Sequence, residues 1–593
     1  MRYRIVAFDF EVFATWWCVV FQELKTGKQV VVENDPQKLS RILSRDRDIF
    51  IGWNSKFYDQ AIAKAICTGA SNRIVKELND WIIGEKQLWW EFWWFRQSSR
   101  FDFNTADVRD DAQSGLSLKS IEGHMHLPII ESSIPFDLER ELTRAEKDEI
   151  VKYCKHDVST TAKLIHERAD YFRTKAYLGE MVGIPFPRAI SLTNAKLVAA
   201  YLGARRKAHN DERVYDIPKE LKQERIPSEV FEFFSRMDDP DLTDEEVFKS
   251  KLEIDFCDIP TVFAYGGVHG ARPTYRESAT SNRRVVLADV SSMYPTTMIK
   301  YDLVSRNIPD PDAFTKVVKE RLEAKHKGDK QTAAALKLVT NTAYGAMLQE
   351  HNNLFDPRRG RSVCITGQLM LADLAAGLAT EMHSATLIQL NTDGVMVSFD
   401  VSENNAFEDV CREWELRTGY ELEYDEIDTV IQRDVNNYIV VFDDGKIKQK
   451  GGELFRGISK AGAWNINNTA NVVARAVGDF LLDGTPVEDT VNRCHNTLDF
   501  QYIAKGGSKY RAVIHEVRGE EIEVQKVNRV YASKDKSLGT LRKIHGKTGS
   551  KEKIAGLPDH CVIDNHNQIT IDRIDKDWYI DQAKKKIEKF IGG

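Results

Sequence analysis

Two apolar segments that each end in or enclose a carboxylate constrain this chain most. Residues 284–289, Arg-Val-Val-Leu-Ala-Asp, form a β-branched run that ends at Asp289 just before a turn. Residues 386–399 hold two apolar runs around Asn-Thr-Asp-Gly, which predicts a hairpin whose tight turn carries Asp393. Adjacent strand ends would bring the two carboxylates close together. Such hard oxygen ligands suit Mg²⁺, and the carbonyl of Val290 is a further candidate ligand.

A second group of polar side chains has helical spacing. Lys337, Asn341 and Tyr344 fall at i, i+4 and i+7, which is one face of a helix. Arg321 and Lys325 repeat the four-residue spacing on the preceding helical stretch. Three cations and an amide that converge in this way can cradle a triphosphate. Taken singly, each segment has an ordinary alternative, since a strand-ending Asp is often only a cap and Lys-x-x-x-Asn is more often a solvated face.

In chain order, Asp289-Val-Ser-Ser-Met-Tyr-Pro, Lys337-Leu-Val-Thr-Asn-Thr-Ala-Tyr-Gly and Leu390-Asn-Thr-Asp-Gly resemble the polymerase core of family B DNA polymerases. The resemblance implies that Asp289, Asp393 and the Val290 carbonyl hold two Mg²⁺ ions, or Mn²⁺ as a substitute, for phosphoryl transfer. It also implies a nucleotide-binding set that consists of Arg321, Lys325, Lys337, Asn341, Tyr294 and Tyr344. In that set Tyr294 lies under the sugar, where its ring would collide with a 2′-hydroxyl.

A second constellation lies near the N-terminus. Asp9 and Glu11 end an apolar strand on one face, Asp59 follows Asn-Ser-Lys-Phe-Tyr, and Tyr153 lies one helical turn before Asp157. The set resembles the proofreading 3′–5′ exonuclease of the same polymerase family. The resemblance implies a two-metal site held by the four carboxylates, with Tyr153 orienting the attacking water.

Two further segments are candidates for DNA contact. Tyr265-Gly266-Gly267 resembles the Tyr-x-Gly element that in this family contacts the template between the two active sites, although a glycine-rich turn without a ligand is the alternative. Lys448 and Lys450 are assigned to primer–template contact, although an exposed Lys-x-Lys is ordinarily a solvated hairpin.

The sequence departs from the family pattern at its hairpin. The family usually has Tyr-x-Asp-Thr-Asp-Ser, whereas Gln389, Asn391 and Gly394 here replace the tyrosine, the first aspartate and the serine. Because the second carboxylate, Asp393, is kept, we expect altered rather than lost activity. Met293 stands where the family generally has leucine, and a flexible thioether there can alter selectivity.

Bulk properties agree with a soluble chain of several lobes. With 593 residues the chain is too long for one core, and its net charge of −7 excludes a protein that is basic throughout. Eight cysteines without a C-x-x-C pair predict reduced thiols rather than a zinc site or disulfide frame. The apolar residues 5–21 are interrupted by Asp9 and Glu11, so neither a signal peptide nor a membrane span is expected. We expect a cytoplasmic protein, in the host bacterial cytosol if it is viral.

The predicted fold is multidomain, mixing α/β and α+β parts. The resemblance implies a ribonuclease H-like exonuclease domain followed by a right-hand polymerase of palm, fingers and thumb. The predicted boundaries are 1–185 for the exonuclease, 186–284 for a connecting region, 285–311 and 351–460 for the palm, 312–350 for the fingers, and 461–593 for the thumb. The early first carboxylate and the short stretch between Tyr294 and Lys337 leave no room for additional domains, which favours a compact phage-type member.

Three other sequence features are either ambiguous or without an expected functional role. The aromatic segment 89–96 packs in the core or stacks unpaired bases. The lysine-rich segment 533–553 is a mobile arm on DNA phosphates or a solvated loop. His156 points about 100° away from Asp157 on a helix and is expected at the surface.

The sequence therefore predicts a DNA polymerase with intrinsic 3′–5′ exonuclease activity that acts in phage DNA replication. Its expected partners are primer–template DNA and deoxynucleoside triphosphates, with no membrane and with a processivity factor or terminal protein left unspecified. A nuclease with a decayed polymerase half is one alternative, prompted by Asn391. A DNA-binding scaffold is another, and the intact carboxylates speak against it.

Overall fold

The computed structural model describes residues 3–110, 112, 115–451, 454, 458–459, 465–466 and 469–592. The chain divides into two compact units. Unit 1 holds residues 1–197, 457–468 and 496–575, and unit 2 holds residues 198–456, 469–495 and 576–593. The boundary predicted between palm and thumb, at residues 460 and 461, lies outside the described residues.

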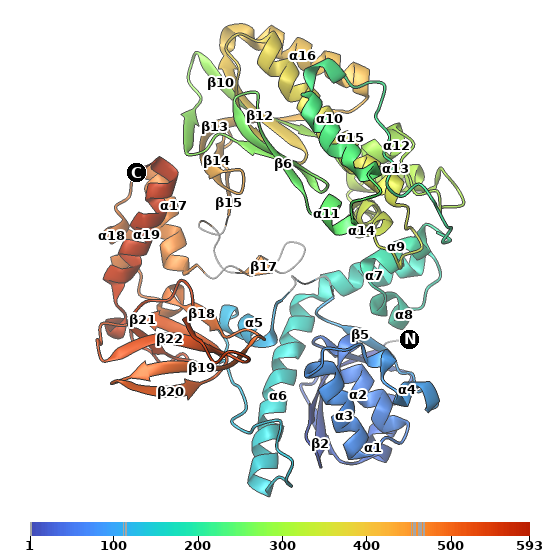
Figure 1. The fold of residues 1–593 in the computed structure, drawn as a ribbon, viewed down its shortest axis with the longest axis vertical. Coiled ribbons are helices and arrows are strands. Elements are labelled where there is room, and N and C mark those ends of the chain that lie inside the picture. Colours follow the sequence, from blue (N-terminus) through green and yellow to red (C-terminus); the bar gives the residue numbers. More distant parts are fainter. Residues whose placement is uncertain are drawn as a thin grey trace. The chain divides into compact units, whose positions relative to one another are not determined.

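The N-terminal part of unit 1 is a five-stranded mixed sheet with helices on both faces (Figure 1). In sheet order the strands are β3 (Gln29–Glu33), β2 (Trp17–Glu23), β1 (Arg4–Val12), β4 (Asp48–Gly52) and β5 (Thr105–Asp107). The central strand, β1, pairs antiparallel with β2 and parallel with β4.

Alternation along β1 decides which side chains meet which helices. Phe8 and Phe10 pack against α2 (Asp59–Cys67) and α3 (Asn72–Ile83), whereas Ala7 packs against α6 (Arg144–Glu167). Because side chains of a strand alternate between faces, Asp9 and Glu11 share the α6 side with Ala7. A capping box formed by Thr143 and Glu146 fixes the start of α6.

The C-terminal part of unit 1 consists of two antiparallel sheets. The first contains β18 (Tyr502–Lys505), β21 (Val527–Ala532) and β24 (Cys561–Ile563). The second contains β20 (Glu520–Val524), β19 (Tyr510–Val517), β22 (Leu538–His545) and β23 (Lys551–Lys553).

The lysine-rich segment 533–553 is neither a mobile arm nor a solvated loop, because most of it forms β22 and β23. Acidic neighbours pair with three of its lysines: Lys543 lies 3.7 Å from Glu552, Lys551 lies 2.6 Å from Glu521, and Lys553 lies 2.5 Å from Asp559. Pairs such as Lys551–Glu521 depend on which strands lie side by side, so the charge pattern alone did not indicate them.

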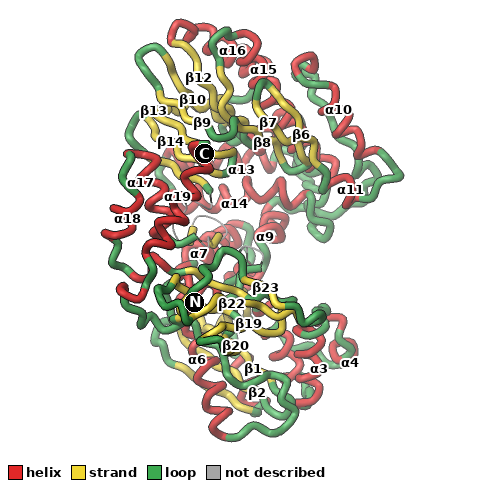
Figure 2. The backbone as a smooth tube through the Cα atoms, turned by 60° about the vertical axis from the view of Figure 1, so that its left-hand side comes forward, coloured by secondary structure: helices red, strands yellow, loops and turns green. Residues whose placement is uncertain are grey.

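Unit 2 is built on a ten-stranded antiparallel sheet, whose strands are shown in yellow in Figure 2. The sheet order is β15 (Ile447–Lys450), β14 (Asn437–Phe442), β13 (Leu422–Asp434), β10 (Arg283–Val290), β12 (Gly394–Asp400), β11 (Thr386–Leu390), β8 (Gly267–Ala271), β7 (Ile259–Ala264) and β6 (Lys251–Phe256), with β9 (Tyr275–Ser278) paired to β13.

A long apolar helix, α15 (Pro357–Glu381), forms the core beneath this sheet together with α16 (Asn404–Thr418). By length and composition α15 is the one helix among the described residues that could cross a membrane, but 89% of its apolar window is buried inside the fold. The indole of Trp414 on α16 donates a hydrogen bond to the carbonyl of Met370, at 3.0 Å. The helix is therefore accounted for by its place in the protein core.

Two groups of helices complete unit 2. The antiparallel pair α13 (Ala313–His326) and α14 (Lys330–Met347) occupies the segment predicted as fingers, and the Asp329 side chain caps α14. The helices α17 (Asn471–Asp483), α18 (Val487–Arg493) and α19 (Lys576–Ile591) pack on one another, and α19 contacts β13.

Candidate active sites

The strand register brings the two predicted polymerase carboxylates to one place. Asp289 is the penultimate residue of β10 and pairs with Gly394, directly after Asp393 in the adjacent hairpin. The backbone N–H of Val290 donates to the Asp393 carbonyl at 2.7 Å, which fixes the turn against the strand end. Ser292 then adopts a left-handed conformation (φ 49°, ψ 48°), and α12 (Met293–Lys300) begins.

Asp289 lies in an environment that disfavours its charge. Burial and the neighbouring Asp393 raise the pKa of Asp289 to about 7, while Lys448 acts in the opposite direction. Glu423 on β13, which is the strand partner of Asp289 on β10, adds further negative charge. A divalent cation would relieve this repulsion, so the oxygen-only donor set fits Mg²⁺ or Mn²⁺. Glu423 was not predicted, because its strand gives no local signal that it faces Asp289.

These carboxylates line a cavity of about 410 Å³. Its other wall includes Arg321 from α13 and Asn341 from α14. The complete lining consists of residues 289–295, Arg321, Thr340, Asn341, Thr392, Asp393 and Glu423. The structure thus brings Asp289, Val290, Tyr294, Asp393, Arg321 and Asn341 together, as the sequence indicated.

Lys325 and Lys337 do not line the cavity. Both are exposed, and neither they nor Arg321 form an ion pair with any described residue, whereas their neighbours Lys316 and Lys327 do. The predicted cradle is therefore half assembled, with two cations left uncompensated beside it.

The rings of Tyr294, which lines the cavity, and Tyr344 are in tilted contact, with ring centroids 4.7 Å apart. Both hydroxyls interact electrostatically with the thiol of Cys364 on α15, which is 1% exposed. The Nε2 of Gln368 lies 3.4 Å from the same sulfur atom. Sequence reasoning missed Cys364, because no motif connects α15 with the two tyrosines.

Replacing Cys364 with valine should remove the polar thiol that interacts with both tyrosine hydroxyls. We expect the free energy of unfolding to fall by about 1–3 kcal/mol and the KM for nucleotides to rise, because unpaired buried hydroxyls are costly and the rings would lose their anchor. Cys364→Ser keeps an acceptor and should behave nearly as the wild type in both measurements. Equal effects of the two substitutions would contradict this role.

The departures in the hairpin have local structural roles. Asn391 accepts the backbone N–H of Thr392 at 2.9 Å and the Nδ1 of His269 at 3.2 Å, so its amide shapes the turn. A Cβ atom at Gly394 would lie 2.8 Å from Asp289 Oδ1, which means that glycine leaves room for this carboxylate. The replaced residues therefore surround Asp289 and Asp393 without displacing them.

The predicted template element is only partly at the surface. Tyr265 is buried among Phe233, Phe234 and Phe248, and its hydroxyl donates to the Phe233 carbonyl at 3.0 Å. Its ring is thus a core residue and does not reach the surface. Gly266 lies in the turn between β7 and β8 and is exposed, whereas Gly267 is the first residue of β8, and a Cβ there would lie 3.7 Å from Thr392 Oγ1. Contact with a template from this element would have to come from the backbone of these glycines.

Lys448 and Lys450 both lie on β15 and are exposed. Lys448 lowers the pKa of Asp289, and Lys450 interacts electrostatically with Asp393, which places both ammonium groups near the carboxylates. Lys450 Nζ also lies 5.7 Å from the ring centroid of Tyr438. The position suits phosphate contact beside the site, and the DNA contact itself stays a prediction.

The five predicted nuclease residues meet between β1, α2 and α6. The backbone N–H of Phe10 donates to Asp59 Oδ1 at 3.0 Å, which holds this carboxylate beside those of Asp9 and Glu11. From α6, Tyr153 and Asp157 interact electrostatically with each other and with Asp9. The local spacings predicted from the sequence therefore correspond to one cluster.

Burial dominates the electrostatics of this cluster. It raises the pKa of Asp59 to about 7 and that of Asp157 to about 6. Burial and the other carboxylates also raise the pKa of Asp9 and Glu11 well above the usual range. Four mutually repelling carboxylates with few internal cations fit a site for divalent metal ions.

A lysine that the sequence did not indicate partly compensates this charge. Lys119 on α5 (Leu118–His124) forms an ion pair with Asp157, and its Nζ lies 3.4 Å from Glu122 and 4.6 Å from the ring centroid of Tyr153. The Nε2 of His156 lies 3.1 Å from the fully buried Glu122 carboxylate. His156 is thus half-buried rather than fully exposed at the surface, because α5 packs on α6 beside it.

These pKa values predict a pH-dependent response to metal. Asp59 has a pKa of about 7 in the folded protein, against an ordinary value of 3.8, so the folded state binds its proton more tightly than the unfolded state does. The metal-free protein therefore loses stability as the pH rises between these two values. Metal ions bind the ionised groups and relieve their repulsion. We expect the increase in Tm on adding Mn²⁺ to be larger at about pH 8 than at about pH 6. Asp59→Asn should reduce this difference, and a pH-independent shift would contradict it.

The aromatic rings of segment 89–96 are divided between the protein core and the surface. The rings of Trp89, Phe92 and Trp94 pack in the core, and the Trp89 indole donates to the Lys56 carbonyl at 3.1 Å. Trp90 and Trp93 remain 48% and 44% exposed. Core packing is thus the role of most of the segment.

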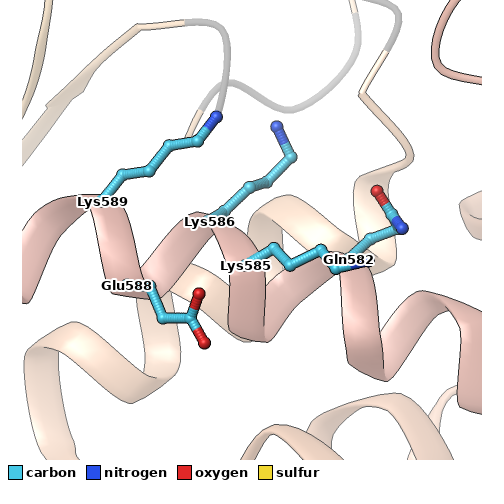
Figure 3. A pocket seen from close by; sticks show the side chains of 5 residues that line it. All are labelled: Gln582, Lys585, Lys586, Glu588 and Lys589. Atoms are coloured by element: carbon cyan, nitrogen blue, oxygen red, sulfur yellow. The ribbon is translucent and has the colours of Figure 1, made fainter. Parts of the chain in front are cut away.

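A basic hollow of about 520 Å³ lies on α19 (Figure 3). Lys586 and Lys589 extend to one side of the helix and Glu588 to the other, while Lys585 is paired with Asp581 at 2.6 Å. Several lysines on one helix attract phosphate without specificity. It is a basic surface in the segment predicted as thumb, on a helix that the charge pattern did not single out.

Comparison with known proteins gives distant structural similarity alone. No protein-family model matches the sequence, and no curated protein matches it. Among solved structures, the fold is similar to that of the family B DNA polymerase from the hyperthermophilic archaeon Pyrobaculum calidifontis, with a TM-score of 0.40 and 14% sequence identity. The match covers 100% of this chain and 78% of that chain. A similarity this distant leaves the function to be argued from the two sites.

Proposed function

We propose that this chain is a DNA-directed DNA polymerase that extends primer 3′ ends with deoxynucleotides and carries a 3′–5′ exonuclease in the same polypeptide. One observation supports the polymerase most: Asp289 and Asp393 line the same cavity as Arg321 and Asn341. Carboxylates for metal ions and donors for phosphate oxygens are the two halves that nucleotidyl transfer requires.

Each group has a role that follows from its chemistry. Arg321 neutralises and orients phosphate oxygens, and the Asn341 amide donates to them. Tyr294, anchored by Cys364, limits the space beside the sugar. Mg²⁺ held by Asp289 and Asp393 would stabilise the charge that develops on the transferring phosphate.

The uncompensated lysines support a closing movement of the helix pair α13–α14. Lys325 and Lys337 are exposed beside the cavity and have no ion-pair partner among the described residues. Movement of the pair toward a bound triphosphate would add their charges to that of Arg321. Such a step lets base-pair shape control the assembly of the site.

The nuclease is supported by the convergence of Asp9, Glu11, Asp59, Asp157 and Tyr153 on one cluster. A sheet with helices on both faces carries them, and we interpret this part as a ribonuclease H-like domain. Tyr153, one helical turn before Asp157 on α6, can position a water molecule for attack on the terminal phosphodiester. We infer a compact, phage-type replicative enzyme that acts in the host cytosol.

Incubation of a labelled primer on a longer template tests both activities. With Mg²⁺ and all four deoxynucleotides we expect extension, and with Mg²⁺ alone we expect shortening from the 3′ end. Shortening without extension under any condition would favour a nuclease with a decayed polymerase half, for which Asn391 in the hairpin is the specific observation. Absence of any metal-dependent turnover would leave only a DNA-binding scaffold.

A further inference from the structure

A cleft of about 810 Å³ in unit 1 opens over the nuclease carboxylates Asp9 and Asp59. One wall comes from the N-terminal sheet and its loops and includes Tyr58 and Arg109. The other wall comes from the C-terminal sheets and consists of Lys505, Gly506, Gly507, Ser508, Tyr510 and Lys543. Neither the sequence motifs nor the proposed function accounts for this second wall.

Specific contacts hold the C-terminal sheets against the nuclease cluster. Arg529 on β21 is fully buried and donates to the carbonyls of Gly123, at 3.1 Å, and Leu127, at 2.8 Å. Glu131 accepts the backbone N–H groups of Lys526, at 2.7 Å, and Val527, at 3.1 Å. Buried polar contacts of this kind fix the position of the C-terminal sheets relative to the N-terminal part of unit 1, so the second wall belongs to the cleft.

The second wall has the opposite charge to the floor. Lys505 Nζ donates to the Gly115 carbonyl at 2.7 Å, which holds its ammonium at the rim with donors to spare. Lys543 Nζ lies 4.1 Å from the ring centroid of Tyr510 and 3.7 Å from Glu552 Oε2, and Arg109 adds positive charge from the first wall. Four carboxylates alone would repel a polyanion, so a cationic wall is what a nucleic acid entering this cleft requires.

The geometry of the turn between β18 and β19 also suits close contact with a ligand. Gly507 has a φ of +83°, and Gly506 donates its N–H to the Lys526 carbonyl at 2.8 Å. The absence of side chains there lets backbone approach a ligand closely. The Tyr510 hydroxyl donates to Glu552 at 2.7 Å, which fixes the ring at the edge of the cleft.

We propose that residues 505–510 and Lys543 bind the single-stranded 3′ end of DNA that enters the nuclease site. Lys505 and Lys543 contact its phosphates, and Tyr510 stacks on an unpaired base. A paired base has no free face for such stacking, which makes the site selective for single strands. This inference rests on the proposed nuclease function and adds that the C-terminal sheets supply part of its substrate site.

The test compares full-length variants in degradation of a 5′-labelled single-stranded oligonucleotide. The double variant Lys505→Ala/Lys543→Ala should raise KM about tenfold, with kcat changed little, because binding rather than chemistry is affected. The slope of log KM against log salt concentration should fall by about 1.4, or about 0.7 for each phosphate that a lysine no longer neutralises. Tyr510→Leu should raise KM without changing this slope.

A matched control is available in the same sheet. Lys551 and Lys553 on β23 are paired with acidic residues, as Lys543 is with Glu552, but they do not line the cleft, so Lys551→Ala/Lys553→Ala should keep the wild-type KM and slope. Lys505→Arg/Lys543→Arg should restore both values. If the alanine variant fails to fold, Lys505→Gln/Lys543→Gln keeps the aliphatic stems and answers the same question.

The outcomes separate the two levels of the proposal. An unchanged KM and salt slope in folded Lys505/Lys543 variants, with active wild type, would overturn the role of the second wall alone. A wild type that degrades no oligonucleotide with Mg²⁺ or Mn²⁺ would overturn the nuclease itself, and the wall assignment with it.

Discussion

Asp289→Asn is expected to slow primer extension by at least about 10³-fold while leaving shortening of the primer intact. The substitution keeps the size of the side chain but removes a carboxylate that holds Mg²⁺, and metal stabilisation of a phosphoryl-transfer transition state is worth several kcal/mol. The rate of single-nucleotide addition on a primed template measures the effect.

The protein should remain folded in this variant. Burial and Asp393 raise the pKa of Asp289 to about 7, so a neutral side chain there removes repulsion in the metal-free state. Thermal unfolding at about pH 8 should therefore show no loss of stability.

Asp302→Asn is the matched control. Asp302 is also in unit 2, shortly after α12, and its side chain is 90% exposed. Its φ of 51° is one that asparagine adopts readily, so extension and stability should both be unchanged. Wild-type extension by Asp289→Asn would remove Asp289 from the catalytic assignment.

Local sequence could predict the carboxylates because their geometry is local. A tight hairpin fixes the register of its own strands, so Asp393 had to lie at a strand end. Tyr153 and Asp157 share a helix face for the same kind of reason, since one turn separates them. Such predictions need no knowledge of how distant segments pack.

The residues that were missed come from contacts between distant segments. Glu423 meets Asp289 through strand pairing, Cys364 meets the two tyrosines through helix packing, and Lys119 reaches Asp157 from another helix. No spacing in the sequence encodes these neighbours. Equally, Tyr265 belongs to a pattern typical of a binding element, yet its ring is enclosed by three phenylalanines that lie on other elements.

The C-terminal region shows the same limit at a larger scale. The segment 461–593 was assigned to the thumb by position, and the assignment stays a prediction. In the structure, residues 496–575 belong to unit 1, whereas residues 469–495 and 576–593 belong to unit 2. Interleaved lysines concealed the strands of 533–553, because the acidic partners that neutralise them lie elsewhere in the sequence.

Asp9→Asn is expected to abolish shortening of the primer, with a loss of at least about 10³-fold, and to leave extension intact. Asp9 is surrounded by Asp59, Asp157 and Glu11, and an amide in its place cannot provide the negative charge that binds a metal ion. Release of label from a 3′-labelled single strand measures the loss. Asp102→Asn, whose side chain is 78% exposed in the same unit, should retain full activity.

The same variant should be more stable than the wild type without metal, and this separates a functional from a structural role. Burial and neighbouring carboxylates raise the pKa of Asp9, so its ionised form destabilises the folded state as pH rises. A neutral amide removes that cost, so in the presence of a chelator at about pH 8 the Tm of Asp9→Asn should exceed that of the wild type. The difference in Tm should disappear at about pH 4, because the wild-type carboxyl is then protonated. A carboxylate that only supported the fold would give the opposite result, because its removal would lower the Tm. Loss of cleavage together with a gain in stability would show that charge is kept at this position for metal binding, against the preference of the surrounding fold.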